Sequence, residues 1–492
     1  MRHGIAVAVG SFGILGLLWV GCGSGDGGTN DHDAGFIDAA PHPTCGNGVT
    51  EYGEACDGAD LSGHTCDTLA AQLTSGTLAC QPDCSGYDVS GCVAEGQTFD
   101  ALSCEQGDVQ AAVDAAGDGD TVVVPAGQCT WTTPAACDGR VDCAGVHLPG
   151  TSITLQGAGV GSTIIHSDIP EGWAHATVFA DTQEGKPVRV TGFTFTGIIA
   201  PAVSIAGPDR SFRVDHCDIT PLADNWVVAI SVVSRAHGVV DHCTLADSEV
   251  IILPDEDDAW SRPLTLGTAH AVYIEDCTFT NSGAIDDVVD GRSGARFVYR
   301  YNTLTNMELH LHGIEGGGSR GTHSYEFYEN TGICDGSVNC YRMAYLRGGT
   351  GVLFNNTWTG DWSSGGLMVV HQCVYTDSCT GFKACNRYPC HDQIGRTTDH
   401  DGDTVQDLVP LLEWNNTIDG VDVDLTVQDD THPEMAEYIQ EGRDYYNDTV
   451  TYDATTGCYD TSFSADNGDV VHLRYKPYVY PHPLVQVAAD LP

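Results

Sequence analysis

The sequence predicts an all-β protein, a parallel β-helix in which successive coils of the chain stack into a solenoid. Three observations support this prediction. A short motif recurs along the chain, most often at intervals of 24 to 28 residues, and a fixed period of this length is typical of one supersecondary unit per coil. Apolar residues occupy the same columns in each copy of the motif. Glycine makes up 59 of the 492 residues, which favours a turn-rich β protein over a helical one.

The first 22 residues are expected to form a signal peptide. The apolar segment at residues 5–20 is too short for a stable membrane span. Residues 18–22, LWVGC, resemble the bacterial lipobox, although Trp19 stands where that family usually has leucine. The resemblance implies a lipid on Cys22 and export as an outer-membrane lipoprotein of the cell surface, with ordinary secretion as the alternative.

A tether and a small disulfide-rich module are expected next. Residues 23–44 are rich in Gly, Asp and Pro and predict a flexible tether. Six cysteines lie between Cys45 and Cys92 in a segment with too few large apolar residues for a core, so we expect three disulfides within residues 45–96. The motifs CGNG and EYGEACD resemble the Cys-rich repeat of surface proteins from myxobacteria and their relatives. This resemblance implies a surface spacer or interaction module and says nothing about catalysis.

Further cysteines lie in close pairs, as is typical of disulfide-closed short loops in an oxidising compartment. A zinc site is disfavoured because no CxxC…CxxC spacing occurs. The expected pairs are Cys137 with Cys143, Cys334 with Cys340, Cys373 with Cys379, and Cys385 with Cys390.

Residues 97–492 are expected to form the β-helix, closed by an irregular C-terminal part. At its start, residues 108–116 have the apolar spacing of a short helix, and residues 121–124 follow as a β-branched strand. A capping helix at this place would hide the open edge of the first coil.

The recurring segments align on one registered position, which we expect to point inward. Residues three before it and two after it are apolar and predict two core columns, while the polar pair between them predicts an outward bend. Stacked asparagines at such a bend can bond to one another and to turn amides, and Asn tolerates a left-handed backbone. The stacked thiols are expected to be small buried hydrophobes. The registered residues, at separations of 24, 26, 34, 25, 28, 26 and 60, are Phe193, Cys217, Cys243, Cys277, Asn302, Asn330, Asn356 and Asn416.

This pattern, together with the opening DVQAAVDAAGDGDTVVVPAG, resembles the right-handed parallel β-helix proteins of the pectin lyase-like superfamily, including bacterial members. The likeness covers roughly residues 100–485. It implies the fold, but that superfamily includes lyases, hydrolases, esterases and adhesins, so it does not imply one activity. We expect a monomer.

Charge limits the partners. The chain has 68 acidic residues against 20 Lys plus Arg, a formal net charge of −48, which argues against nucleic acid as a partner. An anionic partner requires either a local cluster of arginines or a bridging Ca²⁺. Such a cluster exists within 56 residues and consists of Arg292, Arg296, Arg300, Arg320, Arg342 and Arg347.

Acids and histidines accompany these arginines and define the candidate catalytic site. Asp287 and His310 are 23 residues apart, about one coil, so they and their neighbours Asp290 and His312 are expected to meet on adjacent coils. One interpretation is β-elimination of an acidic polysaccharide, in which arginine neutralises the uronate carboxylate and a base removes the neighbouring proton. Arg320 and Arg300 would then clamp the carboxylate or act as base, and His312 or His310 would be base or acid.

Two alternatives remain open. Paired Asp286 and Asp287, followed by LHLHG and then Arg342, loosely resemble the polygalacturonase order, which implies hydrolysis. A non-catalytic carbohydrate-binding or adhesion protein is the other alternative, with the arginines pairing with acids between coils.

A second acidic segment could hold calcium. Asp399, Asp401, Asp403 and Asp407 offer oxygen ligands at alternating spacing, but Gly402 is misplaced relative to an EF-hand loop and no Glu closes the ring. The spacing therefore favours a solvated acidic loop, with bound Ca²⁺ as the alternative. No other cofactor is expected.

Overall fold

The computed structural model describes residues 37–38, 46–48, 50, 55–69, 73–81, 84, 86–89, 91–94, 96–133, 143–172, 175–183, 185–207, 211–222, 227–283, 287–314, 320–363, 366–370, 389–399, 406–428, 435–447, 450–464 and 470–485.

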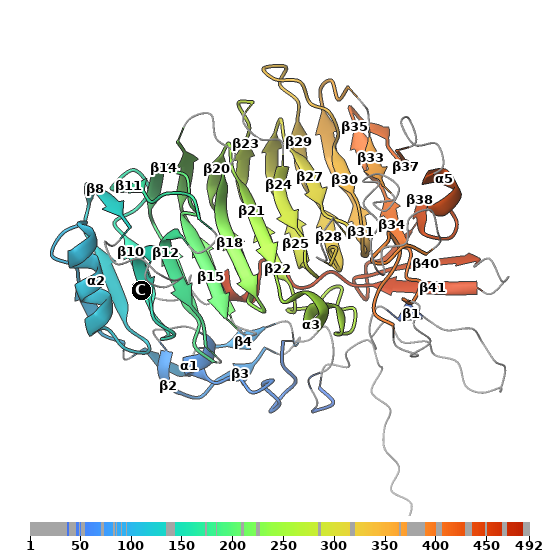
Figure 1. Cartoon of the computed structure of the whole chain (residues 1–492). Coiled ribbons are helices and arrows are strands. Elements are labelled where there is room, and N and C mark those ends of the chain that lie inside the picture. Colours follow the sequence, from blue (N-terminus) through green and yellow to red (C-terminus); the bar gives the residue numbers. More distant parts are fainter. Residues whose placement is uncertain are drawn as a thin grey trace, which may run out of the picture.

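Three long parallel sheets run the length of the molecule (Figure 1), with 12, 11 and 10 strands in the described part of the chain. The chain visits them in turn, so that strands pair with the strand one coil later in the same sheet; the exception is Val421–Asp422, which pairs antiparallel with the strand just before it. Val214 pairs with Val240, and Val240 pairs with Ile274. Parallel crossovers of this kind wind right-handed. The predicted all-β, right-handed parallel β-helix is confirmed.

The strands of each sheet are as follows. The 12-stranded sheet contains β6 (Thr98–Asp100), β7 (Thr121–Val124), β10 (Thr154–Gly157), β13 (Val188–Thr191), β16 (Ser211–Asp215), β19 (His237–Asp241), β22 (Val272–Glu275), β25 (Arg296–Arg300), β28 (Ser324–Tyr328), β31 (Thr350–Phe354), β34 (Leu411–Trp414) and β38 (Tyr445–Asn447). The 11-stranded sheet contains β8 (Gly127–Thr132), β11 (Thr163–Asp168), β14 (Thr194–Ile198), β17 (Asp218–Pro221), β20 (Thr244–Ala246), β23 (Thr278–Thr280), β26 (Thr303–Thr305), β29 (Thr331–Ile333), β32 (Thr357–Thr359), β35 (Thr417–Ile418) and β36 (Val421–Asp422). The 10-stranded sheet contains β9 (Ala144–Leu148), β12 (Ala176–Asp181), β15 (Val203–Gly207), β18 (Val228–Ser234), β21 (Glu249–Leu253), β24 (Asp287–Gly291), β27 (Glu308–Leu311), β30 (Ala344–Leu346), β33 (Leu367–Val369) and β37 (Leu425–Val427).

The predicted columns form the core between the three sheets. Residues three positions before the registered one are completely buried, and so are most of those two positions after it. Each rung therefore buries apolar side chains against the same positions of the next rung, which is how a solenoid builds one continuous core from repeated short strands. The column before the registered position consists of Val190, Val214, Val240, Ile274, Tyr299, Phe327 and Leu353.

Helix α2 (Gln106–Ala115) covers the first coil, as predicted (Figure 1). Val109 and Val113 are fully buried in the same core cluster as the coils. A disulfide between Cys104 and Cys129 ties the start of this helix to β8. The open end of the solenoid is thereby removed from solvent, which protects its unpaired strand edge.

The registered asparagines form a continuous hydrogen-bonded ladder. The backbone N–H of Asn302 donates to Oδ1 of Asn330 at 2.9 Å, and that of Asn330 donates to Oδ1 of Asn356 at 3.0 Å. Each side-chain Nδ2 donates in turn to a carbonyl of the preceding coil, as from Asn330 to Tyr299 at 2.9 Å. Every rung is thus hydrogen-bonded to both neighbouring rungs. The polar groups in these bonds are buried, so leaving any of them unpaired would lower the stability of the fold.

The buried thiols continue the same ladder with sulfur. Cys277 Sγ accepts from the backbone N–H of Cys243 at 3.4 Å and donates to the carbonyl of Val240 at 3.7 Å. Cys243 Sγ donates likewise to Val214 at 3.7 Å. These cysteines are buried and free, as expected, but they are also hydrogen-bonding groups that occupy the place of the asparagine amide.

The left-handed residue of the bend is the one before the registered position. The prediction that the registered asparagine itself takes this conformation is wrong, because positive φ values near 50–57° occur at the preceding residue of each rung. There the side chain points to solvent, while the registered side chain needs a regular backbone to reach inward. The left-handed residues are His216, His242, Asp276, Tyr301, Glu329, Asn355 and Asn415.

The C-terminal part packs on the outside of the 12-stranded sheet. Arg300 donates to the carbonyls of Tyr478 and Val479, and Glu275 accepts from the backbone N–H of His482 at 2.7 Å. A small sheet precedes this tail and contains β1 (Ile37–Asp38), β39 (Thr451–Asp453), β40 (Cys458–Ser464) and β41 (Val470–Tyr475). Two short helices, α3 (Glu256–Trp260) and α5 (Met435–Tyr438), lie in connections between coils.

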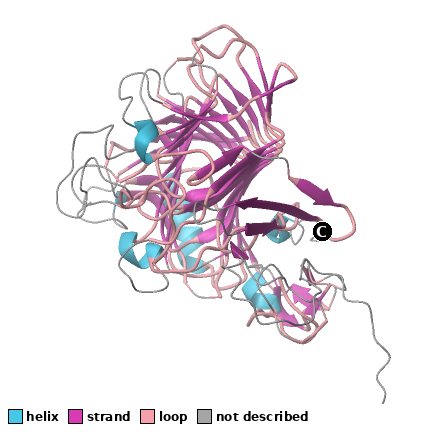
Figure 2. Cartoon of the chain, turned by 90° about the vertical axis from the view of Figure 1, so that its right-hand side faces the viewer, coloured by secondary structure: helices cyan, strands magenta, loops and turns pink. Residues whose placement is uncertain are grey.

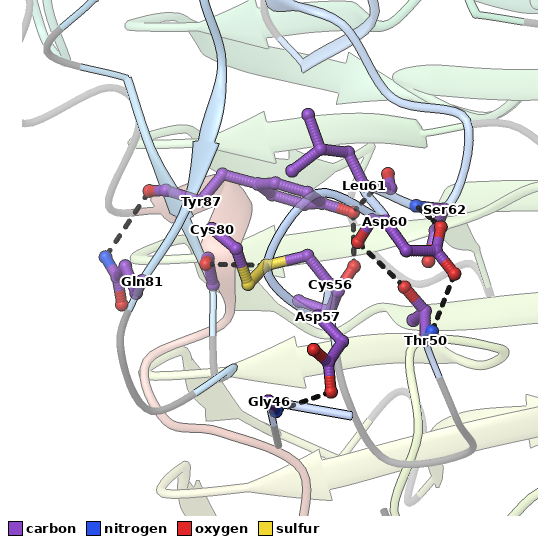
Figure 3. The surroundings of a disulfide bond; sticks show 12 residues. Gly46, Thr50, Cys56, Asp57, Asp60, Leu61, Ser62, Cys80, Gln81 and Tyr87 are labelled. Carbon is purple, nitrogen blue, oxygen red and sulfur yellow. Dashed lines mark hydrogen bonds between the residues drawn. A yellow bond between two sulfur atoms is a disulfide. The ribbon is translucent and has the colours of Figure 1, made fainter. Parts of the chain in front are cut away.

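The Cys-rich segment lies beside the coils as a small separate unit (Figures 1 and 2). It contains α1 (Cys66–Leu69) and two short antiparallel pairs, β2 (Leu73–Gly76) with β5 (Cys92–Ala94) and β3 (Ala79–Cys80) with β4 (Tyr87–Asp88). Asp57 is fully buried beside the disulfide of Cys56 with Cys80 and accepts backbone N–H bonds from Gly46, Asn47 and Gly48 at 2.6–3.0 Å (Figure 3). The CGNG and CD parts of the motif are therefore in contact in the structure, because the aspartate of CD accepts hydrogen bonds from the backbone of the glycine turn.

Disulfides occur both in the small module and in the coils. The expected Cys334–Cys340 bond is confirmed, and Cys66–Cys92 is a second bond of the small module. Cys84, Cys143 and Cys390 are also disulfide-bonded, to partners outside the described residues. The expected pairs Cys137–Cys143, Cys373–Cys379 and Cys385–Cys390 each include a residue outside the described ranges.

The predicted signal peptide and Cys22 lie outside the described residues, and of the tether only Ile37 and Asp38 are described. Across the described ranges, helices are too short or too polar to pass through a membrane.

Candidate functional site

The candidate site lies on the outer face of the 10-stranded sheet, where β24, β27 and β30 are neighbours. Strand pairing aligns Asp290 with His310 and His310 with Tyr345. Because side chains alternate along a strand, these three point away from the core that Val289 and Leu309 fill. An irregular register between Asp287 and Asp290 brings Asp287 to the same face.

Asp287 and His310 meet, as the spacing of one coil predicts. Nδ1 of His310 lies 2.6 Å from Oδ1 of Asp287, and both side chains are mostly buried, at 18% and 15% exposed. Glu308 completes a group whose potential ligand atoms all lie within 4.8 Å of one another. An aspartate at Nδ1 favours the tautomer that carries its proton there, so Nε2 keeps its lone pair.

The second ring nitrogen of His310 is buried and makes no hydrogen bond with the described residues. Burial lowers the pKa of His310 well below its usual value, and the positive charges of Arg347 and of a protonated His312 act in the same direction. The negative charge of Asp290 acts in the opposite direction, but burial has the larger effect. His310 is therefore a neutral imidazole at neutral pH, with an unprotonated Nε2.

His312 and Asp290 form a second pair beside the first. Nε2 of His312 lies 3.2 Å from Oδ1 of Asp290, whose carboxylate also pairs with Arg292. The rings of His310 and His312 lie face to face, with centroids 5.3 Å apart. The four residues Asp287, Asp290, His310 and His312 are thus brought together as predicted.

Three arginines surround these pairs. Arg342 holds Glu308 through Nε and Nη2 at 2.8–3.2 Å, and its guanidinium lies 3.6 Å from the centre of the Tyr345 ring. Arg347 donates from Nε to the carbonyl of Leu311 at 2.9 Å. With Arg292, they concentrate positive charge on one small area of a protein whose formal net charge is −48.

The structure does not bring Arg300 to this site. It lies on β25 of the 12-stranded sheet, is completely buried, and gives its N–H groups to Glu275, to the Tyr328 hydroxyl and to two tail carbonyls. A guanidinium with these partners has no donor left for a substrate carboxylate.

Arg320 also makes structural ion pairs. It binds the buried carboxylate of Asp392 through two bonds of 2.8 Å, pairs with Asp257 at 2.5 Å, and lies over the Trp260 ring. It belongs to the packing of α3 against the coils, next to the site and outside the group formed by the acids and histidines.

The proposed calcium ligands are described in part. Asp399 and Asp407 lie in the described residues, while Asp401 and Asp403 lie outside them. The backbone N–H of Thr397 donates to the carbonyl of Asp407 at 3.0 Å. Calcium at this loop stays a prediction.

Sequence reasoning missed Glu308 and Tyr345. Strand alternation was the available signal for Glu308, because Glu308, His310 and His312 are two residues apart and share a face of β27 and its extension. Tyr345 has no such signal, since its place beside His310 depends on the loop that joins β27 to β30.

The fold and this group define a parallel β-helix protein with a mixed acid, histidine and arginine site on one outer sheet. The chain matches no protein-family model and no curated protein. Among solved structures it is similar to ORF18 of Geobacillus virus E2, with 14% identity, a TM-score of 0.30 and 56% of each chain covered. It is also similar to catalytic domains of GH87 α-1,3-glucanase in complex with tetrasaccharides or with nigerose, at 8% and 9% identity, TM-scores of 0.30 and 0.31, and coverage of 72% of this chain and 68% of theirs. Similarities this low assign neither a family nor an activity.

Proposed function

We propose that this protein binds an acidic polysaccharide and cleaves it by β-elimination. The observation that carries the proposal is the buried pair of His310 and Asp287, placed among Arg292, Arg342 and Arg347 on the outer face of a β-helix. An extended sheet face suits a polymer, because successive sugars can lie along neighbouring coils.

The chemistry needs two kinds of group. The proton on the carbon next to a uronate carboxylate becomes removable when positive charge compensates the carboxylate, which Arg347 and Arg292 would supply. His310 would take the proton, which requires the bound polymer to reach its buried Nε2. The released electron pair forms the carbon–carbon double bond as the glycosidic carbon–oxygen bond breaks, and His312 or water protonates the departing oxygen.

Hydrolysis of the polygalacturonase type is the second candidate. It needs a carboxylic acid that is protonated before the reaction, which in turn needs a raised pKa. Of the paired Asp286 and Asp287 that suggest this reaction, Asp287 lies 2.6 Å from Nδ1 of His310, and Asp286 lies outside the described residues. A carboxylate committed to a histidine suits orientation of that ring better than proton donation. A non-catalytic binding or adhesion protein is the third candidate.

The proposed location is the cell surface. Lipidation at Cys22 and the tether of residues 23–44 would hold the small module and the β-helix outside the outer membrane. Calcium at Asp399, Asp401, Asp403 and Asp407 would add a cation beside the polymer.

A substrate panel tests the reaction class. Pectate, alginate and glycosaminoglycans are each incubated with the protein, with and without Ca²⁺, while ultraviolet absorbance and reducing ends are followed. New absorbance identifies elimination, reducing ends without absorbance identify hydrolysis, and polymer retention with neither identifies a binder. The lyase proposal is falsified if no polyuronate gains an unsaturated end.

Matched variants test the site. His310→Ala should lower elimination at least about 100-fold, the usual effect of losing a general base. His147→Ala is the control, because His147 lies on the outer face of the same sheet and also pairs with an aspartate, Asp181, at 3.0 Å. Arg347→Ala should raise KM and lower kcat, whereas Arg235→Ala should change neither. Equal loss in His310→Ala and His147→Ala would mean that general stability, and not the site, controls activity.

A further inference from the structure

A pair of exposed histidines lies away from the candidate site, at the bend between the 12-stranded and 11-stranded sheets. The motif VDHC occurs twice, 26 residues apart, and places His216 and His242 at the same position of neighbouring coils. Both residues have a left-handed backbone, with φ of 50° and 51°. Their side chains are 56% and 45% exposed, so the bend presents them to solvent.

The two imidazoles are held in the same orientation. Nδ1 of His216 lies 2.8 Å from Oδ2 of Asp215, and Nδ1 of His242 lies 2.9 Å from Oδ2 of Asp241. The rings stack with centroids 5.1 Å apart and planes only 5° from parallel. Because the Nδ1 atoms face equivalent carboxylates, the two Nε2 atoms lie next to each other on the opposite edge.

The carboxylates that orient the rings are held in place by arginines. Asp215 and Asp241 are completely buried. Arg189 binds Asp215 through two bonds of 2.7 Å, and Arg213 binds Asp241 through bonds of 2.8 and 2.7 Å. A carboxylate at Nδ1 and a free Nε2 is the arrangement that metal-binding histidines use, since it sets the tautomer and raises ligand basicity.

A carboxylate occupies the same bend position on the next coil. Asp276 also has a left-handed backbone, with φ of 55°, and its Oδ1 accepts a hydrogen bond from the Tyr480 hydroxyl at 2.7 Å. On the other side of His216 the bend position is Gly192, so no side chain blocks approach along the row.

We propose that His216 and His242 form a surface site for a divalent transition metal such as Zn²⁺, Ni²⁺ or Cu²⁺, with the carboxylate of Asp276 as a neighbouring negative charge on the next coil. Imidazole nitrogens select these ions over Ca²⁺ and Mg²⁺, which prefer oxygen. Two nitrogens on one tetrahedral zinc ion, each at about 2.0–2.1 Å, lie about 3.4 Å apart. The ring centroids are 5.1 Å apart. The two Nε2 edges must therefore move toward each other by less than about 2 Å in total, and side-chain rotation at an exposed bend permits a shift of that size. Water would complete the coordination, and the ion would clip neighbouring coils together.

Calorimetric titration of the full chain tests the site. ZnCl₂ and NiCl₂ should each bind with one saturable equivalent, while CaCl₂ should not bind at this site. His216→Ala and His242→Ala should each weaken zinc binding by at least about tenfold, and Asp276→Asn should weaken it less. Asp215 and Asp241 are left unchanged because their loss would disturb the buried ion pairs.

Two controls separate this site from other parts of the surface. His166→Ala removes another exposed histidine and should leave the affinity unchanged. His310→Ala removes a member of the Asp287, Glu308 and His310 group, whose ligand atoms are also close together. The proposal is overturned if zinc binds His216→Ala and His242→Ala as tightly as the unchanged protein, if binding is lost in His310→Ala instead, or if no saturable binding occurs. Circular dichroism confirms that each variant is folded, and zinc should raise Tm only where both histidines are present.

Discussion

The asparagine ladder should be the most sensitive element of the β-helix to substitution, and Asn356→Ala tests it most directly. Asn356 is completely buried. Its Oδ1 accepts from the backbone N–H of Asn330 at 3.0 Å, and its Nδ2 donates to the carbonyl of Phe327 at 2.9 Å. Alanine removes both partners and leaves both backbone groups inside the protein. Each loss costs about 1–3 kcal/mol, so the free energy of unfolding should fall by about 2–6 kcal/mol.

Asn356→Cys is the matched comparison. Cysteine already occupies this column at Cys243 and Cys277, where sulfur accepts the same backbone N–H and donates to the same kind of carbonyl. Sulfur bonds are weaker than amide bonds, so Asn356→Cys should cost clearly less than Asn356→Ala. Asn355→Gly, at the half-buried left-handed position next to it with φ of 55°, should change stability by less than about 1 kcal/mol.

The assay is reversible urea unfolding with disulfides intact, followed by circular dichroism and by hydrogen exchange of the neighbouring rungs. Repeat proteins can unfold in parts, so exchange shows whether the loss is local to the coils beside Asn356. A free energy of unfolding for Asn356→Ala within about 1 kcal/mol of the unchanged protein, at an equal denaturant slope, would refute the reasoning.

Other predictions concern buried charge and the disulfide cap. Burial raises the pKa of Glu326 to about 7, so the folded state holds a proton that the unfolded chain releases near its ordinary pKa; stability should fall as pH rises from about 4.5 to 7, by up to about 1.4 kcal/mol per pH unit. Glu326→Gln should reduce this slope in unfolding experiments at several pH values, and an unchanged slope would contradict the assignment. Arg320→Ala leaves the buried carboxylate of Asp392 without its guanidinium and should cost about 3–5 kcal/mol, measured by the same urea unfolding; a variant as stable as the parent would return Arg320 to the list of substrate-binding candidates. Replacing Cys104 and Cys129 together by serine opens a loop with a sequence separation of 25 and should cost about 3.5 kcal/mol, with faster hydrogen exchange in the first coils; equal exchange there would show that the disulfide does not hold the cap.

The sequence by itself determined the coils. In a solenoid the contacts of the core join residues about one coil apart, so the pattern repeats along the chain and can be aligned without any other protein. The columns of Val214, Val240 and Ile274, the inward ladder from Cys217 to Asn416 and the meeting of Asp287 with His310 all follow from that period.

Only the tertiary structure decided which arginines accompany the acids and histidines. Arg300 is committed to Glu275 one coil earlier and to the carbonyls of Tyr478 and Val479, which lie 178 and 179 residues further along the chain. Arg320 is similarly committed to Asp392, 72 residues away. These contacts are made by a tail and by loops that have no repeat, so no sequence interval indicates them. Contacts within the stacked coils are periodic and can be read from the chain, whereas contacts across loops depend on how the completed coils bring distant segments together.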